Sequence, residues 1–147
     1  LVVALPQDSV LAQDEGPIRL SDIADQRLIV YPKEPRPSYA DQVLSLLQEE
    51  EIRPRDVLEV REIQTALGLV AADSGVCIIP SSARQMRSDV RYRVIDSPGA
   101  TSPVIMNHRA GDTSRYLDLI RRLIREMYAE KPAWLAANNL AAPDPDP

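Results

Sequence analysis

Short, unbroken apolar runs recur along the first two thirds of the chain. Runs of this length, bounded by turn residues, are typical of parallel strands that are buried on both faces of a sheet. They predict buried strands at residues 1–5 (LVVAL), 28–31 (LIVY) and 76–79 (VCII). Further strands are predicted at 57–60 (VLEV), 90–95 (VRYRVI) and 103–107 (PVIMN). In the run at 90–95, apolar and arginine positions alternate, which predicts a half-exposed strand.

Two longer helices are predicted between these strands, in addition to short ones at residues 20–24 and 81–86. Residues 39–50 have apolar side chains at helical spacing, with Ser38 as a good N-cap and Asp41 at the third helical position, where an acid suits the helix dipole. Residues 63–72 (IQTALGLVAA) are apolar on nearly all faces, so they predict a buried helix, with Gly75 as its left-handed cap. Because strands and helices alternate, the pattern predicts an α/β fold.

The most regular amphipathic pattern lies near the C-terminus. Residues 112–130 predict a helix with Thr113 as its N-cap. One stripe of this helix is apolar, and it consists of Tyr116, Ile120, Leu123 and Met127. From residue 131 onward the character changes, and the last residues (AAPDPDP) are too polar and proline-rich to form a core.

Composition narrows the range of functions. The 147 residues suffice for one domain or one lobe of a larger protein, and a first residue other than Met suggests a piece of a longer chain. A net charge of −5 argues against nucleic-acid binding by this segment, which would need clustered Lys and Arg. The apolar runs are too short for a membrane span.

Enzyme chemistry has little support in the sequence. Cys77 is the one cysteine and lies inside an apolar run, so a buried hydrophobe is favoured over a nucleophile, and a cysteine-based zinc site is excluded within one chain. His108 is the one histidine, and a surface role is favoured for it. No nucleophile elbow, phosphate loop or zinc-protease motif is present. We therefore expect no catalytic residues, no metal and no cofactor.

A binding site is indicated where the proline-rich loop 31–39 (YPKEPRPSY) joins a strand end to a helix that begins at Ser38. Ligands of open α/β sheets bind at the carboxyl ends of strands, and a helix N-terminus offers free N–H groups to a carboxylate or phosphate. Ser38 adds a hydroxyl and Arg36 a charge. The alternative is an ordinary capped helix after a proline-rich loop, and the residues alone leave both interpretations open.

Three segments together resemble a known family. They are residues 59–83 (EVREIQTALGLVAADSGVCIIPSSA), 31–39 (YPKEPRPSY) and 102–109 (SPVIMNHR). They are similar to the effector-binding region of LysR-type transcriptional regulators, in the branch that controls bacterial catechol, benzoate and chlorocatechol degradation. The resemblance extends over about residues 1–130. The core VAAxxGVxIxP is typical of the whole family, whereas YP…RPSY and REIQTALG are specific to the muconate-responsive branch.

The resemblance implies a fold like that of type 2 periplasmic binding proteins, in which two α/β lobes hold the effector between them. Residues 1–101 would be the complete second lobe, and residues 102–130 the returning strand and last helix of the first lobe. Residues 131–147 would be a C-terminal extension. The DNA-binding helix-turn-helix and most of the first lobe would lie outside this sequence.

The same resemblance implies five effector-binding residues: Pro37, Ser38, Tyr39, Glu62 and Tyr116. Pro37 matches the loop proline of the family. Ser38 and Tyr39 match the helix start that meets an effector carboxylate, and they stand where some relatives have Asn and Phe. Glu62 matches an acid that pairs with a first-lobe arginine. Tyr116 matches a tyrosine near a second, benzoate-type pocket.

The implied protein is a cytoplasmic sensor of a small carboxylate such as cis,cis-muconate. Its other partners would be further copies of itself, in a dimer or tetramer, and promoter DNA through the absent helix-turn-helix. Two alternatives stay open: one lobe of an exported solute-binding protein, which shares the fold, and a small α/β enzyme of unrecognised type. An upstream helix-turn-helix would support the sensor, and an upstream signal peptide the solute-binding protein.

Overall fold

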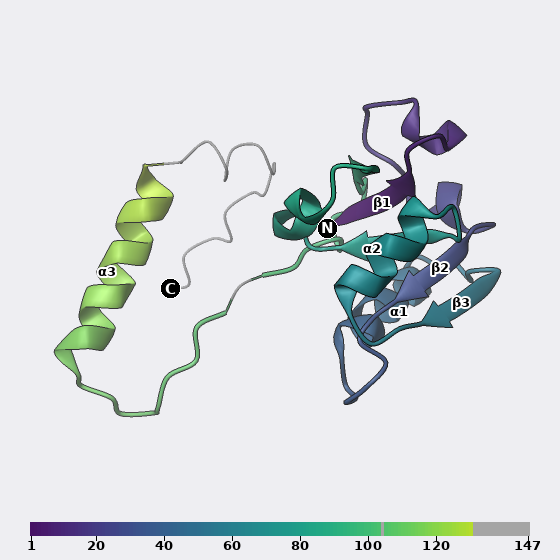
Figure 1. The fold of residues 1–147 in the computed structure, drawn as a ribbon. Helices are drawn as coiled ribbons and strands as arrows, with labels where there is room; N and C mark the ends of the chain where they lie inside the picture. The colour runs from purple at the N-terminus through teal and green to yellow at the C-terminus, as the bar shows by residue number, and fades with distance from the viewer. Residues whose placement is uncertain (104, 131–147) are drawn as a thin grey trace. The chain divides into compact units, whose positions relative to one another are not determined.

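The computed structural model describes residues 1–103 and 105–130 of the chain. It forms two compact units, residues 1–102 and 103–147. The first unit contains one sheet with helices on both of its faces (Figure 1). In the described part of the second unit, one helix forms. Among the described residues, no helix is both long and apolar enough to cross a membrane.

The sheet has the strand order β3-β2-β4-β1-β5. Its strands are β1 (Val2–Pro6), β2 (Arg27–Val30), β3 (Asp56–Glu59), β4 (Val76–Ile79) and β5 (Val90–Val94), each within one residue of the predicted bounds. β2 is parallel to β3 and β4, whereas β1 is antiparallel to both of its neighbours, β4 and β5. The expectation of parallel strands was wrong for β1, because an apolar run reports burial and not direction.

Each face of the sheet is covered by one predicted helix (Figure 1). Helix α1 (Tyr39–Glu49) packs Val43, Leu46 and Leu47 into one apolar layer, together with the short 3₁₀ helix Leu20–Ile23. Helix α2 (Ile63–Ala71) packs into the other layer. The remaining 3₁₀ helices are Val10–Ala12 and Ser81–Met86. The α/β fold predicted from the sequence is therefore confirmed.

The turn that follows α2 differs from the prediction. Asp73, not Gly75, takes the left-handed conformation, with φ of 56°. Gly75 has φ of 151°, and a Cβ there would lie 2.4 Å from the backbone oxygen of Arg27. The glycine is needed because β4 enters the sheet directly beside the start of β2, and the sequence could not reveal that close approach.

Strand β5 does not alternate as predicted. Arg93 is 8% exposed whereas Val94 is 41% exposed. The Arg93 guanidinium donates to four acceptors in the segment between β1 and β2. They are the carbonyl oxygens of Leu11, Gly16 and Pro17 and the carboxylate of Asp14. Because its donors are satisfied, Arg93 is tolerated in a buried position.

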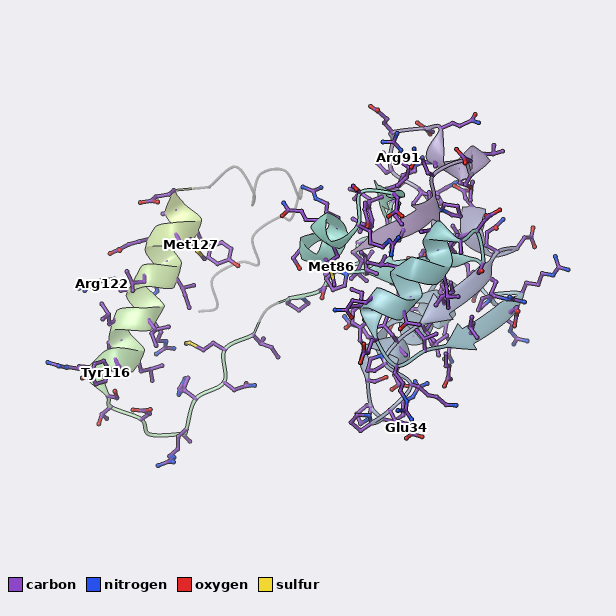
Figure 2. All side chains as sticks on the ribbon, viewed as in Figure 1. Glu34, Met86, Arg91, Tyr116, Arg122 and Met127 are labelled. Atoms are coloured by element: carbon purple, nitrogen blue, oxygen red, sulfur yellow. The ribbon has the colours of Figure 1, made fainter. Side chains whose placement is uncertain are left out.

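In the second unit, helix α3 (Arg115–Ala129) begins after an N-cap at Ser114 rather than Thr113, since the Ser114 hydroxyl accepts from the Tyr116 N–H. The predicted apolar stripe is exposed in the described unit, and Met127 and Arg122 project from different sides of the helix (Figure 2). The strand predicted at 103–107 was wrong for residues 103 and 105–107, which have no strand partner among the described residues. The extension predicted at 131–147 lies outside the described residues.

We expect opposite effects from adding a methyl group at two glycines of the first unit. Gly75→Ala should lower the free energy of unfolding by about 2 kcal/mol or more, because it strains the backbone and drives Cβ into the Arg27 oxygen. Gly68→Ala should raise it by about 0.5–1 kcal/mol, because alanine is the better helix former. At Gly68 a Cβ meets only the Arg87 guanidinium, at 3.9 Å.

Urea denaturation followed by far-ultraviolet circular dichroism measures both changes in the same protein. Equal stability of the two variants would contradict the close approach between Gly75 and Arg27.

Candidate functional site

The parallel strands β2 and β3 end at the same edge of the sheet, and their continuations stay paired beyond the strands. The Val60 N–H donates to the Val30 carbonyl at 2.9 Å, and the Lys33 N–H donates to the Val60 carbonyl at 2.9 Å. The proline-rich loop 31–38 therefore starts beside the segment that leads from β3 into α2. In an open α/β sheet this is the edge at which ligands bind.

Ser38 is the N-cap of α1, as predicted, with extended backbone angles. Its backbone N–H donates to the Asp41 carboxylate at 2.6 Å, and its hydroxyl donates to the Pro32 carbonyl at 3.0 Å. The hydrogen bond from Ser38 holds the pKa of Asp41 below its ordinary value. The Ser38 N–H is therefore occupied by the chain's own carboxylate.

The next two N–H groups of α1 belong to Tyr39 and Ala40, which occupy the first two helical positions, where no carbonyl of the preceding turn can accept from them. Among the described residues, neither N–H makes a hydrogen bond. Ala40 is fully buried, so of the two only the Tyr39 N–H is a candidate donor to a ligand. A carboxylate at this helix start would gain that donor and the positive end of the helix dipole.

Two tyrosine rings pack against each other at the start of α1. The centroids of Tyr31, at the end of β2, and Tyr39 lie 5.3 Å apart, with the rings tilted by 32°. Burial raises the pKa of both phenols well above its usual range. The Tyr39 hydroxyl is buried and has no hydrogen-bond partner in the described chain. The pair therefore offers an apolar surface for packing rather than a titrating group.

Arg36 is not available as the free positive charge that the sequence indicated. Its guanidinium pairs with the carboxylates of Asp41 and Glu59, the latter at 2.8 Å, and donates to the Lys33 carbonyl at 3.0 Å. Every one of these partners belongs to the chain itself. Arg36 instead links the proline-rich loop to α1 and to the end of β3.

Glu62 lies at the same edge, as the N-cap of α2. It is exposed and its side chain makes no capping hydrogen bond. Because β3 leads to Glu62 and β2 leads to Ser38, the two helix starts follow neighbouring strand ends. The structure thus brings Pro37, Ser38, Tyr39 and Glu62 to one edge of the first unit.

Tyr116 belongs to the second unit, at the start of α3. It is 62% exposed, and the Arg115 guanidinium lies 5.0 Å from the centroid of its ring. Arg115 also donates to the Tyr116 hydroxyl at 3.2 Å. This pair presents a cation and an aromatic ring side by side on an exposed surface, as Figure 2 shows for Tyr116.

Neither of the two residues considered for catalysis, Cys77 and His108, has the surroundings that an activated catalytic side chain needs. Cys77 is buried in β4, and burial raises the pKa of its thiol to about 12, so the thiolate is scarce at neutral pH. His108 is exposed, with Nδ1 3.1 Å from the Arg109 carbonyl oxygen. Among residues 1–103 and 105–130, no cluster of three His, Cys, Asp or Glu side chains could hold a metal ion.

Hollows elsewhere on the first unit do not coincide with the predicted residues. One hollow is lined by Pro6, Gln7, Asp8, Ser9, Ala71, Asp73 and Asp89, and another by Leu44, Gln48, Glu51, Ile52, Arg53 and Pro54. Both are open to solvent. We therefore base the candidate site on the sheet edge, where a backbone donor, aromatic rings and charges come together.

Sequence reasoning missed the role of Glu59 and misjudged Arg36. The Ser38-x-x-Asp41 spacing was a readable signal, because an acid at the third helical position often accepts from the N-cap N–H. No local spacing pairs Arg36 with Glu59, which is 23 residues away in the chain. That contact exists because β2 and β3 are parallel neighbours.

The comparisons with known proteins agree on one family. The model of the LysR substrate binding domain matches residues 1–129. The probable cat1 operon transcriptional activator of Acinetobacter lwoffii is 60% identical over 139 residues, which are 95% of this chain and 46% of that protein. The regulator CatR of Pseudomonas putida is 39% identical, over 86% of this chain and 43% of its own length. The chain thus spans about half the length of the curated relatives that it matches.

Solved structures show the same likeness. The BenM effector binding domain with its effector benzoate superposes with a TM-score of 0.84 at 30% identity, over 88% of this chain and 60% of that one. Full-length BenM gives a TM-score of 0.82 over 44% of its chain. Both likenesses extend over most of this chain, so they bear on its fold as well as its family.

The orphaned Tyr39 hydroxyl leads to a prediction about stability. Tyr39→Phe should leave the free energy of unfolding unchanged or raise it by up to about 1 kcal/mol, because a buried donor without a partner stabilises nothing. Tyr39→Ala should lower it by about 3 kcal/mol, because the ring packs against Tyr31. Thermal and urea unfolding measure both. A Phe variant that loses as much stability as the Ala variant would show that the hydroxyl is bonded.

The capping carboxylate leads to a prediction about pH. The pKa of Asp41 is lowered in the folded chain, so its stabilising contribution is present above its ordinary value of 3.8 and is lost as the pH falls through the lower folded value. Asp41→Asn should therefore be less stable than wild type at neutral pH and converge with it in acid. Asp25→Asn, at an exposed carboxylate, is the control. A stability gap for Asp41→Asn that is independent of pH would exclude an ionised cap.

Proposed function

Because the chain belongs to the LysR substrate-binding domain family, we propose that it is the effector-sensing part of a bacterial transcriptional regulator of aromatic degradation. It binds a small carboxylate at the start of α1 and transmits the bound state to DNA-binding heads elsewhere in the protein. The observation that carries the proposal is the Tyr39 N–H, which has no partner among the described residues and belongs to a helix start at the carboxyl edge of the sheet, together with the Tyr31–Tyr39 ring pair.

The fold is that of type 2 periplasmic binding proteins, which the BenM effector binding domain shares. We assign residues 1–101 to the second lobe of such a domain and residues 102–130 to the returning part of the first. On this assignment Pro37, Ser38, Tyr39 and Glu62 contribute one side of the effector site. Tyr116, with Arg115 beside it, contributes to a second, benzoate-type pocket.

The chemistry of the helix start favours an unsaturated or aromatic acid. The carboxylate would accept from the Tyr39 N–H, in a charge-assisted hydrogen bond that contributes about 1.5–3 kcal/mol. The planar hydrocarbon part would pack on the tyrosine pair. cis,cis-Muconate, with a carboxylate at each end, could contact both lobes at once, whereas benzoate could satisfy one lobe only.

Effector binding would act by shifting a population. An effector that contacts both lobes favours one relative arrangement of them, and it can shift the equilibrium only as far as its affinities for the two arrangements differ. Oligomer contacts would carry the change to the DNA-binding heads. Glu62, an exposed charge at the start of α2, is placed to bias the arrangement through a partner on the opposing lobe.

The other two interpretations have less support. The relatives of this chain are transcriptional regulators, which disfavours a lobe of an exported solute-binding protein. A buried Cys77 and an exposed His108 give an enzyme no activated nucleophile, so we propose no catalytic activity. Self-assembly, promoter DNA as a partner and a cytoplasmic location follow from the regulator assignment.

Calorimetric titration of the complete regulator with cis,cis-muconate and with benzoate tests the site. Ser38→Ala should weaken binding modestly, because the backbone donor stays in place. Ser38→Pro should weaken it much more, because it removes the N–H that Asp41 caps and restrains Pro37. Tyr39→Ala should weaken it by losing the ring. Tight binding by both Ser38→Pro and Tyr39→Ala would place the effector elsewhere.

A further inference from the structure

Arg36 is engaged from three directions at the candidate site. Its Nε donates to the Lys33 carbonyl at 3.0 Å, one terminal nitrogen pairs with Asp41, and the other pairs with Glu59 at 2.8 Å. These partners lie in the loop itself, in the first turn of α1 and at the end of β3. One guanidinium therefore fixes the loop to both of the elements that flank the helix start.

The contacts differ from an isolated surface ion pair in their geometry and not in their burial. The side chains of Arg36, Asp41 and Glu59 are 33%, 41% and 35% exposed, so solvent screens their charges. An exposed pair between two flexible side chains contributes little to stability. Here, however, a planar fork with fixed donor directions joins three segments, a geometry that lysine, with a point charge, cannot reproduce.

The electrostatic setting gives the contact a consequence for binding. Asp41 accepts from the Ser38 N–H, so its carboxylate lies at the start of α1, next to the Tyr39 N–H. A bare carboxylate there would repel an incoming anion. Arg36 offsets the charges of Asp41 and Glu59, and each of its three guanidinium nitrogens has a partner within the chain.

We propose that Arg36 is a positioning residue for the anionic effector: it holds the proline-rich loop against β3 and α1, and it screens Asp41 and Glu59 from the bound acid. This inference rests on the proposed effector site and adds to it a residue that does not itself contact the effector. It predicts that effector affinity depends on Arg36 through its two carboxylate partners.

The test is calorimetric titration of cis,cis-muconate into the complete regulator at low and high salt. Arg36→Gln should weaken binding by about tenfold, because the loop loses its contacts to α1 and β3 and the bound acid meets the unscreened carboxylates of Asp41 and Glu59. Arg36→Lys should recover only part of the affinity, because it restores the charge but not the fork. The loss in Arg36→Gln should shrink at high salt, since unscreened carboxylates cause part of it.

A double-mutant comparison separates this role from a purely structural one. Arg36→Gln combined with Glu59→Gln should bind muconate more tightly than Arg36→Gln alone, because one unscreened charge is removed. A structural role would make the double variant equal or worse. Near-ultraviolet circular dichroism of the Tyr31–Tyr39 pair checks in each variant that the loop is folded.

Arg91→Gln is the matched control, since it makes the same change in net charge on the exposed side of β5. Glu34, which marks the proline-rich loop, and Arg91 lie at opposite ends of the unit in Figure 2. Equal weakening by Arg91→Gln, or unchanged affinity in Arg36→Gln, would overturn the inference while wild type still binds. Wild-type protein that binds neither muconate nor benzoate would contradict the proposed function itself.

Discussion

The side chains of the central strands alternate between two separate apolar layers. Val3, Leu28 and Ile78 point into the layer covered by α1, whereas their neighbours Ala4, Ile29 and Cys77 point into the layer covered by α2. Because successive residues of a strand face opposite sides, neither layer can be filled without the other. This double burial requires a helix on each face, and both helices must start from strand ends.

The position of the candidate site follows from that constraint. β2 and β3 are parallel neighbours, so the loop into α1 and the segment into α2 leave from one edge of the sheet. Two helix N-termini, with their positive dipole ends, therefore meet the solvent at the same edge. Such an edge attracts anions, and three carboxylates of the chain itself, those of Asp41, Glu59 and Glu62, lie there. The balance between these carboxylates and Arg36 decides how much attraction is left for a ligand.

The two hollows described on the first unit lie away from the candidate site. A helix start with one candidate donor and a pair of tilted tyrosine rings gives a ligand only part of the contacts that a cleft provides. A sensor can exploit this arrangement, because a ligand that completes its contacts elsewhere couples binding to a change of shape. The exposed apolar stripe on α3 belongs to the other unit and is a separate surface.

The sequence by itself determined the strands and helices of the first unit and predicted the place of the candidate site. Apolar runs are local and long enough to mark the five strands, and the Ser38 cap is local as well. Family-specific segments then identified the family. The antiparallel direction of β1, the glycine at position 75 beside Arg27, the burial of Arg93 and the pairing of Arg36 with Glu59 were decided only by the tertiary structure. Each depends on which strands become neighbours, and residues brought together across a sheet leave no periodic signal along the chain.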